Sequence, residues 1–336
     1  MFFAFLRSKS TVSVSERKTR YADFCQNNYV PLHFQPWWLD AVCTDGEWDV
    51  CLATDGGGTI TGIWPYYQTR RFGLSVVQQP PLTTYAGPWL YYPQNLKPQK
   101  RLYFEKKNLD ELVRQLPRTA FFRQNFHPDI QNWLPLYWAG FRQTTRYTYV
   151  FNDLRDLEKT KAAFKNTLRT DLKKAEQAAK IHRNDDSAAL LFQLHEMSFQ
   201  RKNLHLPYSF ETFRRLHSAL SERQQAAIFI AHDRRSNILH AGLCLAFDEY
   251  RASVLLTGAD PVFKTHCAVW GLFWEAMKFC SERNLSLDFE GSMERNIERG
   301  FRAFGAKLTP YHQIWKARNK PLEVFIRVIA GNFWAT

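Results

Sequence analysis

The most informative segment of the chain is Leu287-Asp-Phe-Glu-Gly-Ser-Met293, in which a short β-rich run is followed directly by a turn signal. Successive side chains of a strand point to opposite faces, so we expect Asp288 and Glu290 on one face and Phe289 on the other. The segment therefore predicts a strand that ends with two carboxylates side by side.

These paired acids allow two interpretations. Neighbouring carboxylates perturb each other's pKa, so Glu290 could act as a general base on an attacking amine or hydroxyl, with Asp288 orienting it. Alternatively, both acids accept hydrogen bonds that anchor the following loop. Gly291 permits a sharp turn, and Ser292 either completes that turn or supplies a proton to a leaving thiolate.

The elements around this segment are predicted from hydrophobic periodicity and turn signals. Helices are expected at 21–27, from Pro36, at 99–116, within 153–180, and at 188–202, 209–222, 266–283 and 294–304. Strands are expected at 48–54, 59–67, 120–126, 141–151, 226–232, 239–247, 252–257, 286–290 and 308–316. Proline and glycine make 76–90 an irregular loop after a strand.

The two halves of the chain repeat this order of elements. The hairpin turns Asp55-Gly-Gly-Gly58 and Asp233-Arg-Arg-Ser-Asn237 occupy equivalent places, and 336 residues suit two domains. We therefore predict an α/β (α+β) fold with two similar tandem units, each a mixed, mostly antiparallel sheet flanked by helices. The expected division is a tail at 1–20, a first unit at 21–152 and a catalytic second unit at 153–336.

The net charge of +13 favours an anionic partner, such as a phosphate, a nucleic acid or an anionic lipid surface, although a merely solubilising surface charge is the alternative. The six cysteines include no close CxxC pair, so we expect reduced thiols, no metal and a cytoplasmic location. No apolar run reaches 18 residues, which argues against a transmembrane helix and leaves peripheral membrane contact open.

A second candidate site lies where the β-rich run 254–260 leads through Pro261 to a helix start. Free backbone amides at a helix N-terminus attract phosphates, so His266, Cys267 and Ala268 are candidates for binding the pyrophosphate of a donor. Every helix begins with free amides, and an ordinary helix start is therefore the alternative.

Basic residues recur every fourth position at Lys161, Lys165, Arg169 and Lys173, which predicts a cationic ridge along one side of a helix. The ridge could bind a nucleotide phosphate, the acceptor arm of a transfer RNA or an anionic lipid-linked precursor, or it could be a solvated helix face.

Arg201 and Tyr208 lie at the end of a predicted helix and in the loop that follows it. Arg201 could clamp a carboxylate or phosphate of the substrate, or it could cap the carbonyl groups of its helix. The motifs GxxxxGK[ST], GxGxxG, HExxH and GxSxG are absent, which argues against the usual nucleotide hydrolases, dinucleotide enzymes, zinc proteases and α/β-hydrolases.

The segment Asp288-Phe-Glu-Gly-Ser-Met293, followed by Ile297, Phe301 and Phe304-Gly-Ala306, resembles the closing section of FemAB-like and CelD-like members of the GNAT superfamily. The segment Asn166–Glu176 is similar to that family's basic helix. This resemblance implies two GNAT-like units and acyl transfer to an amine or hydroxyl, from acyl-CoA such as acetyl-CoA or from aminoacyl-tRNA used to build peptidoglycan bridges.

Two departures from the family bear on the donor. The glycine-rich turn with which typical GNAT enzymes bind CoA is missing from Pro261–Ala268, and the long helical arm of the peptidoglycan-bridge enzymes has no counterpart in 186–222. From the resemblance as a whole, we expect an N- or O-acyltransferase of cell-envelope or secondary metabolism. The alternatives are a tRNA-dependent aminoacyltransferase and an inactive module that binds a glycan or polyanion.

Overall fold

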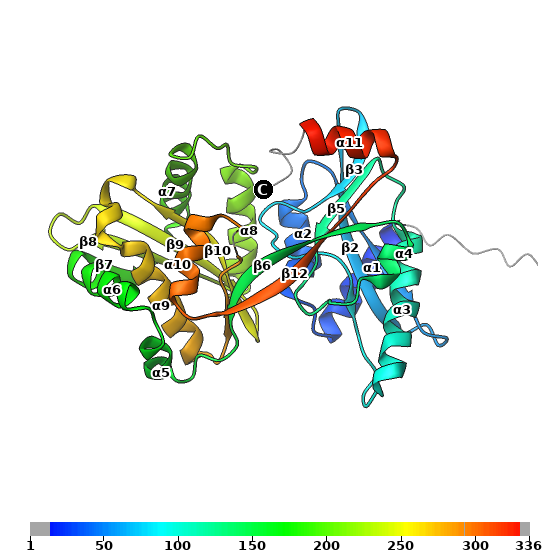
Figure 1. The fold of residues 1–336 in the computed structure, drawn as a ribbon, viewed down its shortest axis with the longest axis horizontal. Helices are drawn as coiled ribbons and strands as arrows, with labels where there is room; N and C mark the ends of the chain where they lie inside the picture. The colour runs from blue at the N-terminus through cyan, green and yellow to red at the C-terminus, as the bar shows by residue number, and fades with distance from the viewer. Residues whose placement is uncertain (1–13, 292, 330–336) are drawn as a thin grey trace, which may run out of the picture.

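The computed structural model describes residues 14–291 and 293–329, which form two lobes joined by two long strands (Figure 1). The first half contains α1 (Val14–Asn27), the 3-10 turn η1 (Leu32–Phe34), α2 (Pro36–Val42), β1 (Glu47–Thr54), β2 (Ile60–Arg71), β3 (Leu74–Gln78), β4 (Trp89–Leu90), α3 (Pro98–Gln115), β5 (Phe121–Asn125), α4 (Leu134–Trp138) and β6 (Arg142–Phe151). The second half contains α5 (Leu157–Ala162), α6 (Asn166–Ala178), β7 (Ala179–Arg183), α7 (Ala188–Gln200), α8 (Phe210–Glu222), β8 (Ala226–Asp233), β9 (Leu239–Phe247), β10 (Arg251–Ala259), the 3-10 helix η2 (Pro261–His266), α9 (Ala268–Glu282), β11 (Ser286–Asp288), α10 (Arg295–Ala303), β12 (Lys307–Ala317) and α11 (Lys320–Ile329).

The strands form one sheet that runs through both lobes in the order β1-β2-β3-β5-β12-β6-β11-β10-β9-β8-β7, with β4 beside β2. Its pairs are antiparallel except for β3 with β5 and β10 with β11. The predicted α/β fold class, a mixed and mostly antiparallel sheet flanked by helices, is therefore confirmed.

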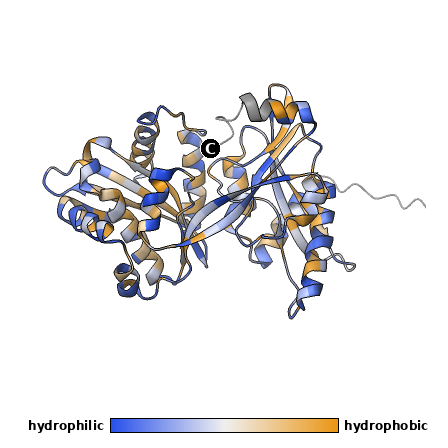
Figure 2. Ribbon diagram, viewed as in Figure 1, coloured by the Kyte–Doolittle hydropathy of each residue, from blue (hydrophilic) through white to orange (hydrophobic). Residues whose placement is uncertain are grey.

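The lobes exchange strands at the middle of the sheet. β12 comes from the end of the chain but pairs with β5 and β6, while the last residues of β6 pair with β11. Figure 1 shows β6 and β12 crossing between the lobes, and Figure 2 shows that this crossing stretch is more hydrophilic than the strands on either side. The two halves are thus interlocked through the centre of the sheet.

A shared hydrophobic core reinforces this junction. One buried cluster contains Trp38 and Leu39 from the first half together with Phe213 and Leu216 from the second, because α2 packs against α8. Arg223 adds a cation–π contact 4.5 Å from the Trp37 ring centroid. The division at residue 152 stays a prediction, and residues 1–13 of the expected tail lie outside the described part.

Several predicted elements need correction. The one or two helices expected within 153–180 are two, α5 and α6, but they end before residue 180, because Ala179 already begins β7, which pairs with β8. The break places Lys161 on α5 and Lys165 at the N-cap of α6, so the four basic residues do not share one helix. The strand expected to reach Glu290 ends at Asp288, while α4 and α11 were not predicted.

All six cysteines are free thiols. In the described part of the chain, none of the helices has the length and apolar character needed to cross a membrane.

Candidate functional site

Two neighbouring strands of the second lobe, β10 and β11, diverge after a short paired stretch. β10 and β11 run parallel and pair over Arg251–Ser253 and Ser286–Asp288, after which β10 continues to Ala259 while the chain beyond β11 turns away. The pairing of β10 with β9 also shifts register between Val254 and Leu256. Such bulges redirect side chains and backbone groups and occur often beside active sites. The diverging strands therefore create a natural place for a ligand.

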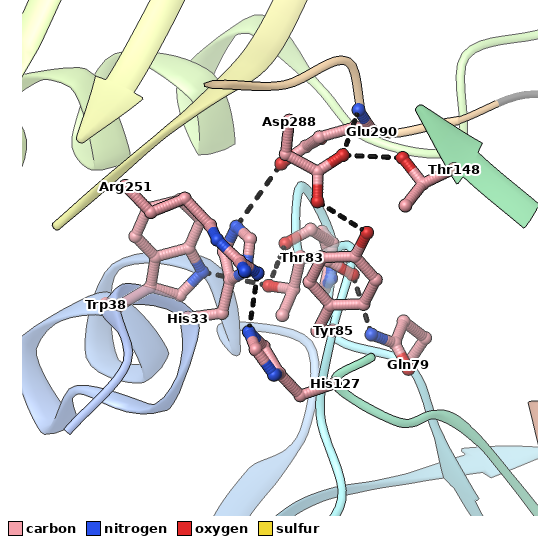
Figure 3. A network of polar contacts seen from close by, with 11 residues as sticks. His33, Trp38, Gln79, Thr83, Tyr85, His127, Thr148, Arg251, Asp288 and Glu290 are labelled. Carbon is pink, nitrogen blue, oxygen red and sulfur yellow. Dashed lines mark hydrogen bonds and ion pairs between the residues drawn. The ribbon is translucent and has the colours of Figure 1, made fainter. Parts of the chain in front are cut away.

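Asp288 is fully buried at the point where the strands diverge. Its carboxylate accepts hydrogen bonds from the hydroxyl of Tyr85 at 2.8 Å, the hydroxyl of Thr148 at 2.5 Å and the backbone N–H of Glu290 at 2.8 Å (Figure 3). Burial raises the pKa of Asp288, although nearby Arg251 and the two hydroxyl groups oppose that effect. Asp288 thus holds the turn that carries Glu290, and its own carboxylate is closed to solvent.

Glu290 follows in a left-handed backbone conformation, with φ of +55°. A non-glycine residue in this region is strained by about 1–3 kcal/mol and persists where its surroundings fix it, often at functional sites. Its Oε1 is buried without a hydrogen-bond partner and lies 3.4 Å from Nε2 of His33, which is likewise buried and without one. The Glu290 side chain as a whole keeps 12% of its surface exposed, although Oε1 is buried.

His33 comes from η1 of the first lobe, and its neighbours fix its ring. Trp38 contacts it edge to face with centroids 4.7 Å apart, and Tyr85 does so at 5.9 Å. Arg251 donates to Nε2 of His127 at 2.8 Å, on the same side of the cluster (Figure 3). Burial, followed by the charges of Arg251 and His33, holds the pKa of His127 well below its usual value.

Tyr208 reaches the same region from the loop before α8. His195 Nδ1 lies 2.6 Å from the carbonyl oxygen of Thr257, which can only accept, so this nitrogen carries the proton. Burial lowers the pKa of His195 and keeps the ring neutral, so Nε2 accepts the Tyr208 hydroxyl proton at 2.8 Å. Burial and then the Glu290 carboxylate raise the pKa of Tyr208. The neutral phenol oxygen remains able to accept a hydrogen bond from a substrate.

The three residues nominated for the donor lie together at a different place. His266 ends η2, Cys267 adopts a left-handed conformation with φ of +58°, and Ala268 begins α9. They lie beside α6, which packs on α9 and η2, and beside His240, whose ring lies 4.9 Å from that of His266. The structure therefore brings Asp288, Glu290 and Tyr208 into one cluster and the donor candidates into another.

The remaining nominations lie on the surface. Lys165 and Arg169 are exposed near the start of α6, where Arg169 bonds Asn166 and the carbonyl of Ala162. Arg201 is exposed at the C-cap of α7. Ser292 lies outside the described residues.

Sequence reasoning missed the partners from the first lobe. His33, Tyr85 and Thr148 lie 140 residues or more before Asp288 in the chain, and no motif links them to it. The only signal was the unusual run of aromatic and proline residues around 76–90, which was expected to be an irregular loop and which contributes Tyr85. A single sequence does not reveal such long-range pairs.

The fold and this cluster define a class of protein. The second lobe combines a mixed sheet, a parallel pair of strands that diverge, and a buried acid at the point of divergence. Residues 162–303 match the family model described as an acetyltransferase (GNAT) domain. The predicted resemblance to the GNAT superfamily is thereby confirmed for this part of the chain.

Solved structures share the fold over nearly the whole chain. FemX is similar with a TM-score of 0.64 and 12% identity, covering 92% of this chain and 98% of its own. The C-terminal domain of a putative lysylphosphatidylglycerol synthetase from Agrobacterium fabrum gives 0.53 and 13%, covering 95% and 96%. A tandem GNAT protein from the clavulanic acid biosynthesis pathway gives 0.50 and 12%, covering 90% and 95%. No curated protein sequence matches the chain.

Proposed function

We propose that this protein is a cytoplasmic N- or O-acyltransferase that moves an acyl group from acyl-CoA to an amine or hydroxyl acceptor in cell-envelope metabolism. The observation that carries the proposal is the Glu290 carboxylate, which is held in a strained turn where β10 and β11 diverge and has no hydrogen-bond partner at Oε1. A base that receives a proton needs a free acceptor atom within reach of the substrate.

The reaction follows from this geometry. The acceptor nitrogen or oxygen attacks the thioester carbon, its proton passes to Glu290, the new C–N or C–O bond forms, and the C–S bond breaks. The thiolate is a good leaving group because thiols are more acidic than alkyl amines, as the reference pKa values of about 8.5 for cysteine and about 10.4 for lysine illustrate. Tyr208 accepts a hydrogen bond from the acceptor and orients it, and Asp288 positions Glu290 through its backbone N–H. Such proton transfer contributes roughly 10²–10⁴-fold in rate.

The two clusters suit an extended donor. The stretch of β10 from Ser253 to Ala259 runs past the end of β11, and six residues of strand span about 20 Å. η2 and the start of α9 follow β10 directly. An anionic group of the donor bound by the amides at Ala268 would therefore be separated from the reacting carbonyl by about the length of that strand segment. His195 and Ser198 already bond Thr257 and Ala259 along this path, and a donor would replace or overlie these contacts.

The decisive experiment replaces the base by its isostere. Acetyl-CoA and longer acyl-CoAs are offered with a panel of amines and hydroxyl compounds, and thiol release is followed by absorbance. Glu290→Gln should lose about 100-fold or more in turnover while the donor still raises the melting temperature, because binding and chemistry are separable. Glu282→Gln, at the exposed end of α9, is the matched control and should match the parent.

Two results would contradict the proposal. Turnover by Glu290→Gln equal to that of the parent would remove Glu290 as the base. A parent that neither consumes acyl-CoA nor is stabilised by it would favour an inactive module that binds a glycan or polyanion.

The exposed basic residues of α6 favour a second candidate, aminoacyl transfer from tRNA to a peptidoglycan precursor. Arg169 and Lys173 both face solvent on a chain of net charge +13. Filter binding of charged tRNA should then weaken steeply with salt, and Arg169→Gln with Lys173→Gln should lower the slope by about 1–2. Lys100→Gln with Lys107→Gln on α3 removes the same charge from the other lobe and serves as the control. A shallow slope, or equal slopes for both pairs, would argue against tRNA.

A further inference from the structure

We propose that Asp233, His240 and His266 form a binding site for a divalent transition-metal ion of the zinc class. Asp233 ends β8, His240 is the second residue of β9, and His266 ends η2. One ligand atom from each of the three side chains lies within 4.8 Å of the others. No metal was expected from the sequence, because its six cysteines form no close CxxC pair.

His240 is the main reason for the proposal. Its residue is only 1% exposed, and both ring nitrogens are buried without a hydrogen-bond partner. A buried polar atom without a partner costs about 1–3 kcal/mol, so native proteins rarely leave one, and a bound ion is one of the recognised explanations. Phe263 stacks on the ring with centroids 4.1 Å apart and fixes its plane. Nδ1 of His266 is likewise buried and without a partner.

The carboxylate of Asp233 is oriented for the same point. Its Oδ1 accepts hydrogen bonds from the backbone N–H groups of Arg235 and Ser236 and from the Ser236 hydroxyl, at 2.7–2.9 Å. Oδ2 is turned towards Nε2 of His240, at 3.4 Å. In this way the turn fixes one oxygen and leaves the other to a ligand, which is how outer contacts orient metal-binding carboxylates.

The spacing suits a tetrahedral ion. Zinc binds histidine nitrogen and carboxylate oxygen at about 2.0–2.2 Å, so two ligand atoms of one tetrahedral ion lie roughly 3.3–3.5 Å apart. The distance between Asp233 and His240 already matches that value. To bring all three ligand atoms to this spacing, the ring of His266 must rotate towards the other two. His266 is half-buried at the end of η2. Two imidazoles and one carboxylate exclude magnesium and calcium, which require oxygen ligands, and leave a fourth position for water.

The competing explanation is an ion pair between a protonated His240 and Asp233. Burial and then His266 lower the pKa of His240, whereas Asp233 and Asp260 oppose that shift. Four ionisable groups face the His240 ring. His232 and His266 disfavour a positive charge on that ring, whereas Asp233 and Asp260 favour it. A neutral imidazole is the form that binds metal.

A bound ion would join η2 to the β8–β9 hairpin. His266 directly precedes Cys267 and Ala268, so the ion would fix the start of α9 without touching the cluster around Glu290. The inference therefore does not depend on the proposed acyl transfer, and a structural role in positioning the helix is what the location supports.

The test uses the full chain without an affinity tag, stripped with a chelator and dialysed. Co²⁺ and Zn²⁺ are then titrated separately, with visible absorption for Co²⁺ and calorimetry and melting temperature for Zn²⁺. We expect one ion per chain, a tetrahedral Co²⁺ spectrum and a raised melting temperature, because the ion binds only the folded state. His266→Gln and Asp233→Asn should each weaken binding by at least about tenfold.

His217→Gln is the matched control. His217 lies on α8, is half-buried, has an unpaired Nε2 and faces Asp185 and Asp186, but belongs to no such three-ligand group among the described residues. It should bind metal as the parent does. The proposal is overturned if the parent binds no ion stoichiometrically, or if His266→Gln, shown to be folded by circular dichroism, binds as tightly as the parent.

Discussion

The turn after β11 offers the sharpest test of the site's architecture, through the substitution Gly291→Ala. Gly291 has φ of +46°, and a Cβ placed on it would lie 2.2 Å from the carbonyl oxygen of Tyr147 and 2.8 Å from Cα of Thr148. Both atoms belong to the backbone of β6, which is paired on both sides by β11 and β12 and cannot simply move away. The substitution therefore combines backbone strain with a steric clash.

These contacts give the expected loss of unfolding free energy for Gly291→Ala. The left-handed conformation costs alanine about 1–2 kcal/mol, and the lower entropy of the unfolded chain returns about 0.4–1 kcal/mol. Relieving the clash must displace the turn and weaken the hydrogen bond from Phe289 N to Tyr149 O or that from Glu290 N to Asp288, each worth about 1 kcal/mol or more. We expect a total loss of about 2 kcal/mol. An unfolding entropy near 2.1 cal/mol/K per residue makes this about 3 °C in melting temperature for 336 residues.

Gly73→Ala provides the comparison. Gly73 has φ of +75° in the turn between β2 and β3, and a Cβ there would meet nothing within 4 Å, so the same substitution carries the strain without the clash. Its loss should be about 1 kcal/mol. Thermal and denaturant unfolding of both variants measure the difference. Equal losses for Gly291→Ala and Gly73→Ala would refute the packing of the turn against β6.

Two further predictions concern His127 and Tyr208. The pKa of His127 is lowered in the folded protein, so its neutral form contributes stability that is present above about pH 6.5 and is lost as the pH falls towards the folded pKa, by about 1.4 kcal/mol per unit. His127→Asn should therefore reduce the loss of unfolding free energy between pH 7 and pH 5, and identical pH profiles for variant and parent would contradict this. Tyr208→Phe should raise KM for the acceptor about tenfold, because it removes a hydrogen bond of roughly 1.4 kcal/mol, while a change confined to melting temperature would assign Tyr208 a purely structural role.

The local elements of the fold could be predicted from the sequence because their signals are local. The glycine run at Asp55–Gly58 predicted the β1–β2 hairpin, and Pro36 predicted the start of α2, as the structure has them. The alternation argument at Asp288 and Glu290 failed in its reasoning, since the strand ends at Asp288 and Glu290 adopts a left-handed conformation. Both side chains nevertheless lie in one polar cluster, because Asp288 holds the backbone of Glu290 through a hydrogen bond.

The surroundings of those acids could not be predicted, because they are created by tertiary structure. Tyr85 and Asp288 are separated by 203 positions in the chain, yet they share a 2.8 Å hydrogen bond. The cluster of Asp233, His240 and His266 likewise depends on η2 folding back beside the β8–β9 hairpin. The four-residue spacing of Lys161 and Arg169 predicted that both lie on one helix. That prediction was wrong, because the chain breaks between α5 and α6.

Both lobes contribute residues to the candidate site, because they exchange strands. The segment that matches the GNAT family, residues 162–303, supplies Glu290 and the diverging strands, whereas the two hydroxyl groups that bond the Asp288 carboxylate come from outside it. Thr148 is on β6, Tyr311 is on β12 with its ring 5.4 Å from that of Tyr85, and His33 belongs to η1. Because β6 and β12 fix these residues against the second lobe, the first lobe acts as one wall of the site. For the proposed acyl transfer, we expect changes in that wall to alter which acceptor is selected, while Glu290 and the diverging strands stay the same.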